Sequence, residues 1–202
     1  MSTLSLFHTS VYKSNLPART ANSLNRQLLR EIEVLTQDDL AGIEWSAKNY
    51  RNGFTSYASA NQMHKVSPTF AELELHIRKH VAKYITSLKL NIKPSQLSMT
   101  TCWVNVMGPN SAHSMHIHPQ SIISGTYYLQ MPKNSSAIKF EDPRYLQFMS
   151  RPPVHLGAGE KYQTHISLPA KPGDVVLFES WIKHEVPINT TQNQRISISF
   201  NY

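Results

Sequence analysis

Three histidines, His113, His116 and His118, lie close together in the chain. His116 and His118 are two residues apart in a segment that we expect to be extended, so both imidazoles would point to the same side. Imidazole nitrogen is a good ligand for iron, zinc, copper and nickel. A third ligand normally comes from elsewhere in the fold, and His184, after a predicted strand, is the candidate. The competing interpretation is that these are hydrogen-bonded or surface histidines. The pattern favours a metal site formed by His116, His118 and His184. A role of His113 as a fourth ligand or a supporting group is an alternative that the pattern does not favour.

The remaining histidines have no comparable setting. His76 and His80 are four residues apart on a predicted helix, and this spacing could bind a metal ion. The glutamate of a zinc protease motif is missing, however. We therefore interpret this pair as solvated side chains on the helix surface.

The last strand-like segment, from Arg195 to Phe200, alternates strictly between polar and apolar residues. Alternation puts the apolar side chains on one face of a strand, and Arg195, Ser197 and Ser199 on the other. This polar face must therefore contact solvent or line a cavity.

Two amphipathic helices and a series of short strands must position these side chains. Apolar residues recur at helical spacing from Leu24 to Leu35 and from Ser67 to Leu88, and Ser67 is the expected N-cap of the second helix. Beyond residue 95, segments rich in β-branched and aromatic residues alternate with turn residues. These segments are Met99–Val106, Ile122–Leu129, Ala137–Phe140, Gln163–Leu168, Val175–Phe178 and Arg195–Phe200.

Many short strands with such turns predict a sandwich, jelly roll or barrel. We expect one domain over residues 1–202, mainly β with α. Its helical N-terminal layer, residues 1–95, would pack on one sheet of a jelly-roll core formed by residues 96–202.

The composition excludes several other classes of protein. The 202-residue chain carries a net charge of +7 and a single cysteine. One cysteine excludes a disulfide framework, a cysteine-rich zinc finger and an iron–sulfur protein. No secretory signal and no apolar run of ~18 residues is present, so we expect a cytoplasmic protein without a membrane span. The basic residues are scattered and no nucleic-acid motif occurs, so nucleic-acid binding is not expected.

Seven motifs in a fixed order make residues 95–202 resemble the Fe(II)/2-oxoglutarate-dependent oxygenases, specifically a small group with a His-x-His-Pro segment. The motifs are Trp103–Asn105, His116–Pro119, Ser124–Leu129, Phe140–Arg144, Pro172–Phe178, Trp181–His184 and Arg195–Asn201. The resemblance implies a double-stranded β-helix, which is a distorted jelly roll. It also implies that His116 is the first metal ligand, that His184 is the distal histidine, and that His118 stands where the family has a carboxylate.

The same resemblance implies Fe(II) as the metal and 2-oxoglutarate as the cosubstrate. The far carboxylate of 2-oxoglutarate would meet Arg195 and Ser197, with Tyr128 assisting. The residue types agree with this, because the planar guanidinium of Arg195 matches a carboxylate and the serine adds a hydroxyl on the same strand face. An exposed arginine on an edge strand is the alternative. No catalytic side chain is expected beyond the metal site.

His118 departs from the usual set of two histidines and one carboxylate. Three outcomes stay open. A three-histidine site could still bind Fe(II) and activate oxygen, or Glu141 or Asp142 could supply the carboxylate. The site could also hold another metal or none, with loss of activity.

The resemblance implies hydroxylation of an unidentified substrate, with conversion of 2-oxoglutarate to succinate and CO2. A cupin-like three-histidine dioxygenase without cosubstrate is one alternative, and it would not need Arg195. A catalytically inactive metal-binding or structural protein is another. We expect a small-molecule or peptide substrate, contacted by residues 51–57 and 144–163, and a homodimer stays open.

Overall fold

The computed structural model describes residues 2–4, 6–144 and 149–202. The helices are α1 (Ala18–Asp38), α2 (Leu40–Asn49), α3 (Met63–Val66) and α4 (Pro68–Leu88), with short 3-10 turns η1 (Pro94–Gln96) and η3 (Glu160–Tyr162). The strands are β1 (Val11–Asn15), β2 (Gly53–Thr55), β3 (Thr101–Met107), β4 (His113–His116), β5 (Ile123–Gln130), β6 (Ile138–Glu141), β7 (His165–Leu168), β8 (Asp174–Glu179), β9 (His184–Val186) and β10 (Arg195–Asn201).

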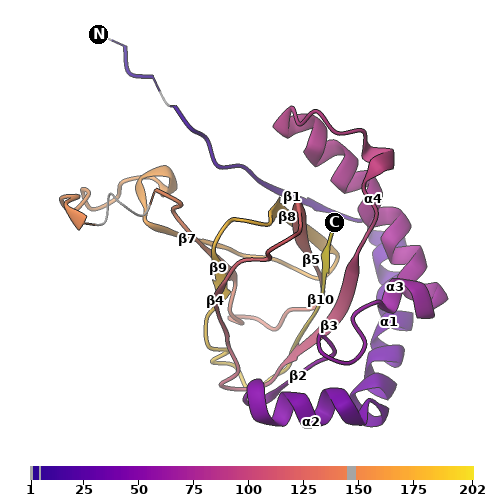
Figure 1. The fold of residues 1–202 in the computed structure, drawn as a ribbon. Helices are drawn as coiled ribbons and strands as arrows, with labels where there is room; N and C mark the ends of the chain where they lie inside the picture. Colours follow the sequence, from indigo (N-terminus) through magenta and orange to yellow (C-terminus); the bar gives the residue numbers. More distant parts are fainter. Residues whose placement is uncertain (1, 5, 145–148) are drawn as a thin grey trace.

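The described strands form two antiparallel sheets. The larger sheet has the order β1-β8-β5-β10-β3-β2, and the smaller has the order β4-β9-β6-β7 (Figure 1). Neighbours in space are mostly distant in sequence, as in a jelly roll. The predicted class, mainly β with α and a double-stranded β-helix core, is therefore confirmed.

One face of the larger sheet is covered by helices α1 and α4 (Figure 1). Both helices match the predicted apolar stripes, and Ser67 caps α4 by accepting a hydrogen bond from the Phe70 N–H. The alternating residues of each strand pack against them. The buried side chains of this layer include Leu24, Leu28 and Ile32 from α1, Phe70, Ile77 and Val81 from α4, and Val104, Tyr127, Leu177, Ile198 and Phe200 from the sheet.

The other face of the larger sheet looks toward the smaller sheet. Part of the space between them is filled by a second apolar cluster that includes Phe140, Phe178 and Ile182. The remainder is lined by polar residues of β3, β5 and β10, so a cavity stays open between the sheets. The polar face predicted for the last strand therefore lines a cavity.

The N-terminal half contributes more than helices. Strands β1 and β2 form the two edges of the larger sheet, by pairing with β8 and β3. Helix α2 begins at an N-cap aspartate, Asp39, whose side chain accepts a hydrogen bond from the Gly42 N–H. It lies below the sheets in Figure 1, next to β2. No helix of the described residues is long and apolar enough to cross a membrane.

Candidate active site

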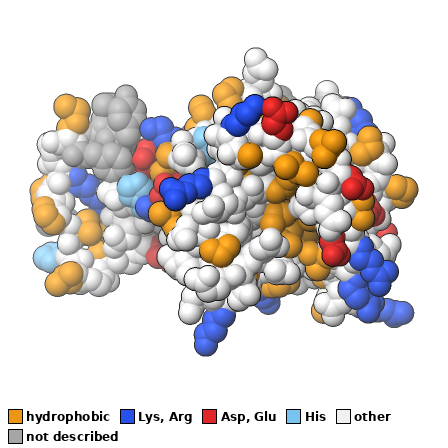
Figure 2. Space-filling view, turned by 90° about the horizontal axis from the view of Figure 1, so that it is seen from below, with side chains coloured by type: hydrophobic (Ala, Val, Ile, Leu, Met, Phe, Trp, Pro, Cys, Tyr) orange, Lys and Arg blue, Asp and Glu red, His pale blue; other side chains and the backbone are white. Residues whose placement is uncertain are grey.

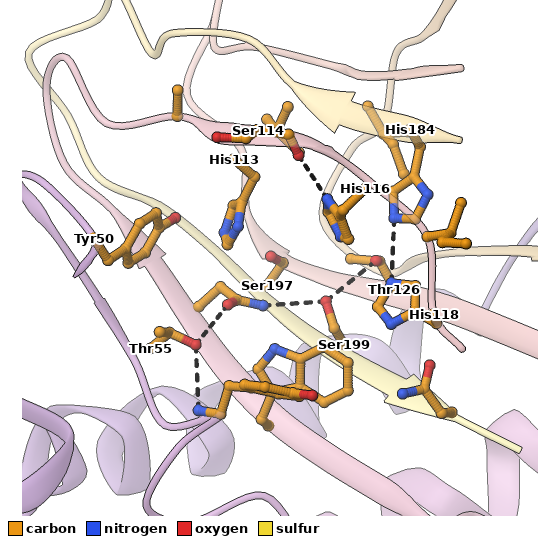
Figure 3. Close-up of a pocket in the computed structure, with 18 of the residues that line it drawn as sticks. Tyr50, Thr55, His113, Ser114, His116, His118, Thr126, His184, Ser197 and Ser199 are labelled. Carbon is orange, nitrogen blue, oxygen red and sulfur yellow. Dashed lines mark hydrogen bonds between the residues drawn. The ribbon is translucent and has the colours of Figure 1, made fainter. Parts of the chain in front are cut away.

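His116, His118 and His184 come together at one side of the cavity (Figure 3). His116 ends β4, His184 begins β9, and the two residues are opposite each other in the antiparallel register. His118 follows β4, and its backbone N–H donates to the carbonyl of Ser180 at 2.9 Å. One ligand nitrogen from each of the three histidines lies within 4.8 Å of those of the other two. The pairing of β4 with β9 therefore brings His184 next to His116 and His118.

The hydrogen bonds of these imidazoles suit metal coordination. The Nδ1 atoms of His116 and His184 lie 2.6 Å and 2.9 Å from the carbonyl oxygens of Ser114 and Ile182. A proton on each Nδ1 would satisfy these contacts and leave Nε2 with a free lone pair, as is usual for metal-binding histidines.

The spacing of the ring nitrogens also fits a shared ion. The Nε2 atoms of His118 and His184 are 3.3 Å apart. Two nitrogens bound to one ion at ~2.0–2.1 Å, with ligand angles near ~90–110°, would be ~2.8–3.4 Å apart. The pair therefore has the separation that one bound metal ion requires.

Burial keeps His118 and His184 neutral. It is the main reason that the pKa of His118 falls to about 4 and that of His184 to about 3, and the neighbouring His116 contributes to both shifts. Only a neutral imidazole offers a lone pair to a metal. At neutral pH these two ligands therefore need no deprotonation before they bind an ion.

These pKa shifts predict how the stability of the metal-free protein depends on pH. In the unfolded chain both histidines regain the ordinary pKa of 6.5, so below that value the unfolded state binds protons that the folded state does not. The stabilisation is fully present above pH 6.5 and is lost as the pH falls toward the folded pKa values. We expect the melting temperature of metal-free protein to fall between pH about 7.5 and about 5.5. A His118→Asn variant should show a shallower decrease, and equal slopes would contradict this account.

Arg195 lies in the same cavity at the start of β10. Its side chain is only 2% exposed, and its Nη1 donates to Ser197 Oγ at 3.3 Å and to the Met107 sulfur at 3.2 Å. The guanidinium also stacks over the Tyr128 ring, 5.2 Å from its centroid. Tyr128 is fully buried behind Arg195 and does not border the cavity. The structure therefore brings Arg195 and Ser197 to the cavity with the three histidines, and sets Tyr128 behind them.

The cavity has a volume of about 400 Å³. Its floor on the larger sheet carries a chain of neutral hydrogen bonds (Figure 3). Thr55 Oγ1 donates to Asn105 Oδ1 at 2.9 Å, Asn105 Nδ2 donates to Ser199 Oγ at 3.1 Å, and Ser199 lies 3.4 Å from the Thr126 hydroxyl. Trp103 stands beside His118, with 5.9 Å between ring centroids. Among the described residues, Arg195 is the only lysine, arginine, aspartate or glutamate that lines this cavity.

Several lining residues were not anticipated from the sequence, among them Asn105 and Thr126 on the floor, and Tyr50 from the end of α2. Ser199, which also lines the floor, lies on the polar face that was expected for the last strand. Polar residues at alternate positions of β3 and β5 were the available signal for Asn105 and Thr126. Residues 51–57 do contribute, through Thr55 and Tyr57. Of residues 144–163, which were expected to contact substrate, 145–148 lie outside the described residues, and none of the others lines the cavity.

The other candidate ligands lie apart from the three-histidine group. Glu141 forms ion pairs with Lys183 at 3.1 Å and with His165 at 3.7 Å, and Asp142 pairs with Arg144. Neither carboxylate lines the cavity, so the expectation that one of them replaces His118 finds no support in the geometry.

Two further histidine interpretations can be compared with the structure. His113 lines the cavity but turns toward Tyr50, with 4.5 Å between ring centroids, and is not in the three-histidine group. His80 is not simply solvated, because it is half-buried and its Nδ1 lies 2.9 Å from the Tyr12 hydroxyl. Of the two helix histidines, His80 therefore packs against a neighbouring side chain of the fold.

A family model described as "Putative 2OG-Fe(II) oxygenase" matches residues 101–201, which is half of the chain. The match begins at β3 and ends at β10, so it includes all three histidines and Arg195. No curated protein matches the sequence.

Solved structures share the fold at low sequence identity. A prolyl-4-hydroxylase from Pseudomonas putida has a TM-score of 0.57 and 12% identity, with 96% of this chain and 91% of that chain covered. The α-ketoglutarate-dependent epimerase SnoN from nogalamycin biosynthesis has a TM-score of 0.63 and 15% identity over 96% of this chain and 77% of that one. HygX from Streptomyces hygroscopicus, with nickel and 2-oxoglutarate bound, has a TM-score of 0.61 and 13% identity over 96% and 82%. The similarity covers the N-terminal layer as well as the jelly roll.

Proposed function

The chain belongs to the 2OG-Fe(II) oxygenase family, and from this premise we propose that it is an Fe(II)- and 2-oxoglutarate-dependent oxygenase whose metal ligands are His116, His118 and His184. One observation carries the proposal: a cluster of three histidines and a buried arginine line the same cavity. Fe(II) with 2-oxoglutarate supplies oxygen-dependent oxidation of a bound substrate, most simply its hydroxylation, with release of succinate and CO2.

The residues present fit both groups. The Nδ1 contacts to backbone carbonyls leave the Nε2 lone pairs of His116 and His184 free for a metal ion. Arg195 is buried without a carboxylate within ion-pair distance among the described residues, and its Nε has no hydrogen-bond partner there. A buried guanidinium normally requires an anionic partner. The far carboxylate of 2-oxoglutarate would satisfy Arg195 and Ser197, with Tyr128 supporting the guanidinium from behind.

Each part of this chain would then have a separate task. The histidines hold the metal as neutral ligands, and Arg195 orients the cosubstrate by its far end. The walls formed by Trp103 and Phe178 limit the access of water to the metal side. Neither a general acid nor a general base is assigned, because neither carboxylate near the site lines the cavity.

We propose a small molecule or a group of a peptide as the substrate. The structures with the same fold include a prolyl-4-hydroxylase, SnoN in complex with nogalamycin RO and HygX with hygromycin B bound, and these compounds differ too much to select one substrate class. The neutral floor and the aromatic wall of Trp103 and Tyr57 favour an uncharged reacting group. Succinate formation with candidate compounds, compared between charged and uncharged forms of one scaffold, tests this, and a preference for charged forms would contradict it.

We propose a cytoplasmic protein that acts on no nucleic acid and carries its helical layer and jelly roll as one domain. On the face seen in Figure 2, lysine and arginine side chains are spread over separate regions, which supports the absence of a nucleic-acid surface. A homodimer remains an option that sedimentation would test.

The decisive experiment is anaerobic titration of the purified protein with Fe(II) and then 2-oxoglutarate. We expect one equivalent of iron to bind and a metal-to-ligand absorption band to appear only when both are present. Iron binding without the band, together with oxidation that is independent of 2-oxoglutarate, would support the cupin-like alternative. Failure to bind iron would support a non-catalytic protein.

A further inference from the structure

The Arg195 side of the cavity holds more unpaired polar groups than the proposed cosubstrate contacts use. The Tyr128 hydroxyl and Arg195 Nε are buried without a hydrogen-bond partner among the described residues, and the buried hydroxyls of Tyr50 and Ser111 have at most each other. Native proteins leave few such groups, and each requires an explanation. A bound ligand with several acceptor atoms would provide one for those that border the cavity.

A chain of contacts connects Tyr50 to Arg195. In the larger sheet Gly53, Met107 and Arg195 are side by side in the register of β2, β3 and β10. Tyr50 belongs to a small buried cluster with Met107 and Val186, and the Met107 sulfur accepts from Arg195. Figure 3 shows Tyr50 beside His113, on the side of the cavity away from His118 and His184. The Tyr50 hydroxyl therefore belongs to the same end of the cavity as the guanidinium.

The local backbone holds the Tyr50 ring in this position. Tyr50 is the C-cap of α2, and its N–H donates to the Ser46 carbonyl at 2.7 Å. A Cβ at Gly53 would lie 2.6 Å from the Tyr50 ring and 2.9 Å from Ser111 Oγ. Glycine at this position is therefore what lets the ring fit between β2 and Ser111.

The chemistry of the hydroxyl matches a carboxylate. Burial raises the pKa of Tyr50 to about 12, an effect that the Ser111 hydroxyl and then the positive charge of Arg195 reduce, so the group remains a protonated donor. A carboxylate offers about four acceptor positions, more than one guanidinium occupies. Tyr50 borders the cavity, whereas Tyr128, which the family resemblance points to, lies behind Arg195.

We propose that Tyr50 is a cosubstrate-binding residue whose hydroxyl donates a hydrogen bond to the far carboxylate of 2-oxoglutarate. This inference rests on the proposed function and adds to it a residue from the N-terminal layer. A helix outside the family-matched segment would then help to select a dicarboxylate over a shorter or monocarboxylic 2-oxoacid.

A two-by-two binding experiment tests the inference. Wild-type protein and Tyr50→Phe are loaded with Fe(II) under anaerobic conditions and titrated with 2-oxoglutarate or 2-oxopentanoate, which has the same keto-acid end but lacks the far carboxylate. We expect Tyr50→Phe to weaken 2-oxoglutarate about 10-fold or more, as for a lost hydrogen bond to a charged group. Its affinity for 2-oxopentanoate should remain within about twofold of wild type.

The matched control is Tyr127→Phe. It removes another buried hydroxyl, which bonds to Asn25 at 2.6 Å on the helix-covered face of β5, and should leave both affinities unchanged. Equal weakening of both ligands by Tyr50→Phe, or no weakening, would overturn the inference, as would a selective effect in Tyr128→Phe alone. If wild-type protein binds iron but not 2-oxoglutarate, the proposed function itself fails. If wild-type protein binds both and Tyr50→Phe binds 2-oxoglutarate with the wild-type affinity, the proposed function stands and the role of Tyr50 does not.

Discussion

Replacing His184 with alanine is expected to abolish stoichiometric iron binding and, with it, the absorption band and 2-oxoglutarate turnover. His184 is buried, its Nδ1 is held by the Ile182 carbonyl, and its Nε2 is 3.3 Å from that of His118. Loss of a supporting hydrogen bond alone typically reduces metal affinity ~10–100-fold. Loss of one of three ligands should exceed that range, as measured by competition with a metal-binding indicator.

Two controls make this result specific. His155→Ala removes an exposed histidine that does not line the cavity and should leave iron affinity unchanged. His118→Ala should also weaken binding, whereas His118→Asp, which supplies the usual carboxylate, should retain it. Wild-type iron affinity in folded His184→Ala protein would contradict the three-histidine assignment.

The parts of the site that sequence analysis predicted depend on short-range periodicity. His116 and His118 are two residues apart, and Arg195 and Ser197 share a strand face, so their relative positions follow once the segments are extended. Helices α1 and α4 have long apolar stripes and were predicted for the same reason. Local patterns of this kind survive folding because burial of one face enforces them.

The parts that were missed depend on contacts between distant segments. Helix α2 is short and only weakly amphipathic, so its pattern did not stand out from a loop. Nothing near Tyr50 in the sequence indicates that its ring will meet His113, because that contact requires β2 to pair with β3 and β4 with β9. Likewise, the position of Tyr128 behind Arg195 follows from the pairing of β5 with β10.

The charges expected in the cavity would favour an anionic ligand. Histidine ligands add no negative charge to a divalent metal, and Arg195 adds one positive charge. A dianionic cosubstrate would reduce this excess of positive charge. In the usual site of two histidines and one carboxylate, the carboxylate ligand already reduces part of it. In the absence of ligands, Arg195 is a buried charge without a carboxylate partner among the described residues, so its free energy of burial opposes folding.

Replacing Arg195 with methionine is therefore expected to have two opposite effects. Truncating one partner of a buried charge pair costs ~2–5 kcal/mol, so 2-oxoglutarate affinity should fall between about 30-fold and several thousand-fold, while iron affinity is retained. The ligand-free protein should become more stable, because an apolar side chain of similar length next to Met107 replaces an unpaired buried charge. A gain on the order of 1–4 kcal/mol would raise the melting temperature by several degrees in a domain of this size.

The two effects must appear together for the assignment of Arg195 to hold. Arg26→Met, on the exposed side of α1, is the control and should change neither quantity. A stabilised variant that still binds 2-oxoglutarate like wild type would mean that the guanidinium does not contact the cosubstrate. A destabilised variant with lost binding would mean that the contacts of Arg195 with Ser197, Met107 and Tyr128 stabilise the folded protein, and the lost binding could then not be assigned to the guanidinium alone.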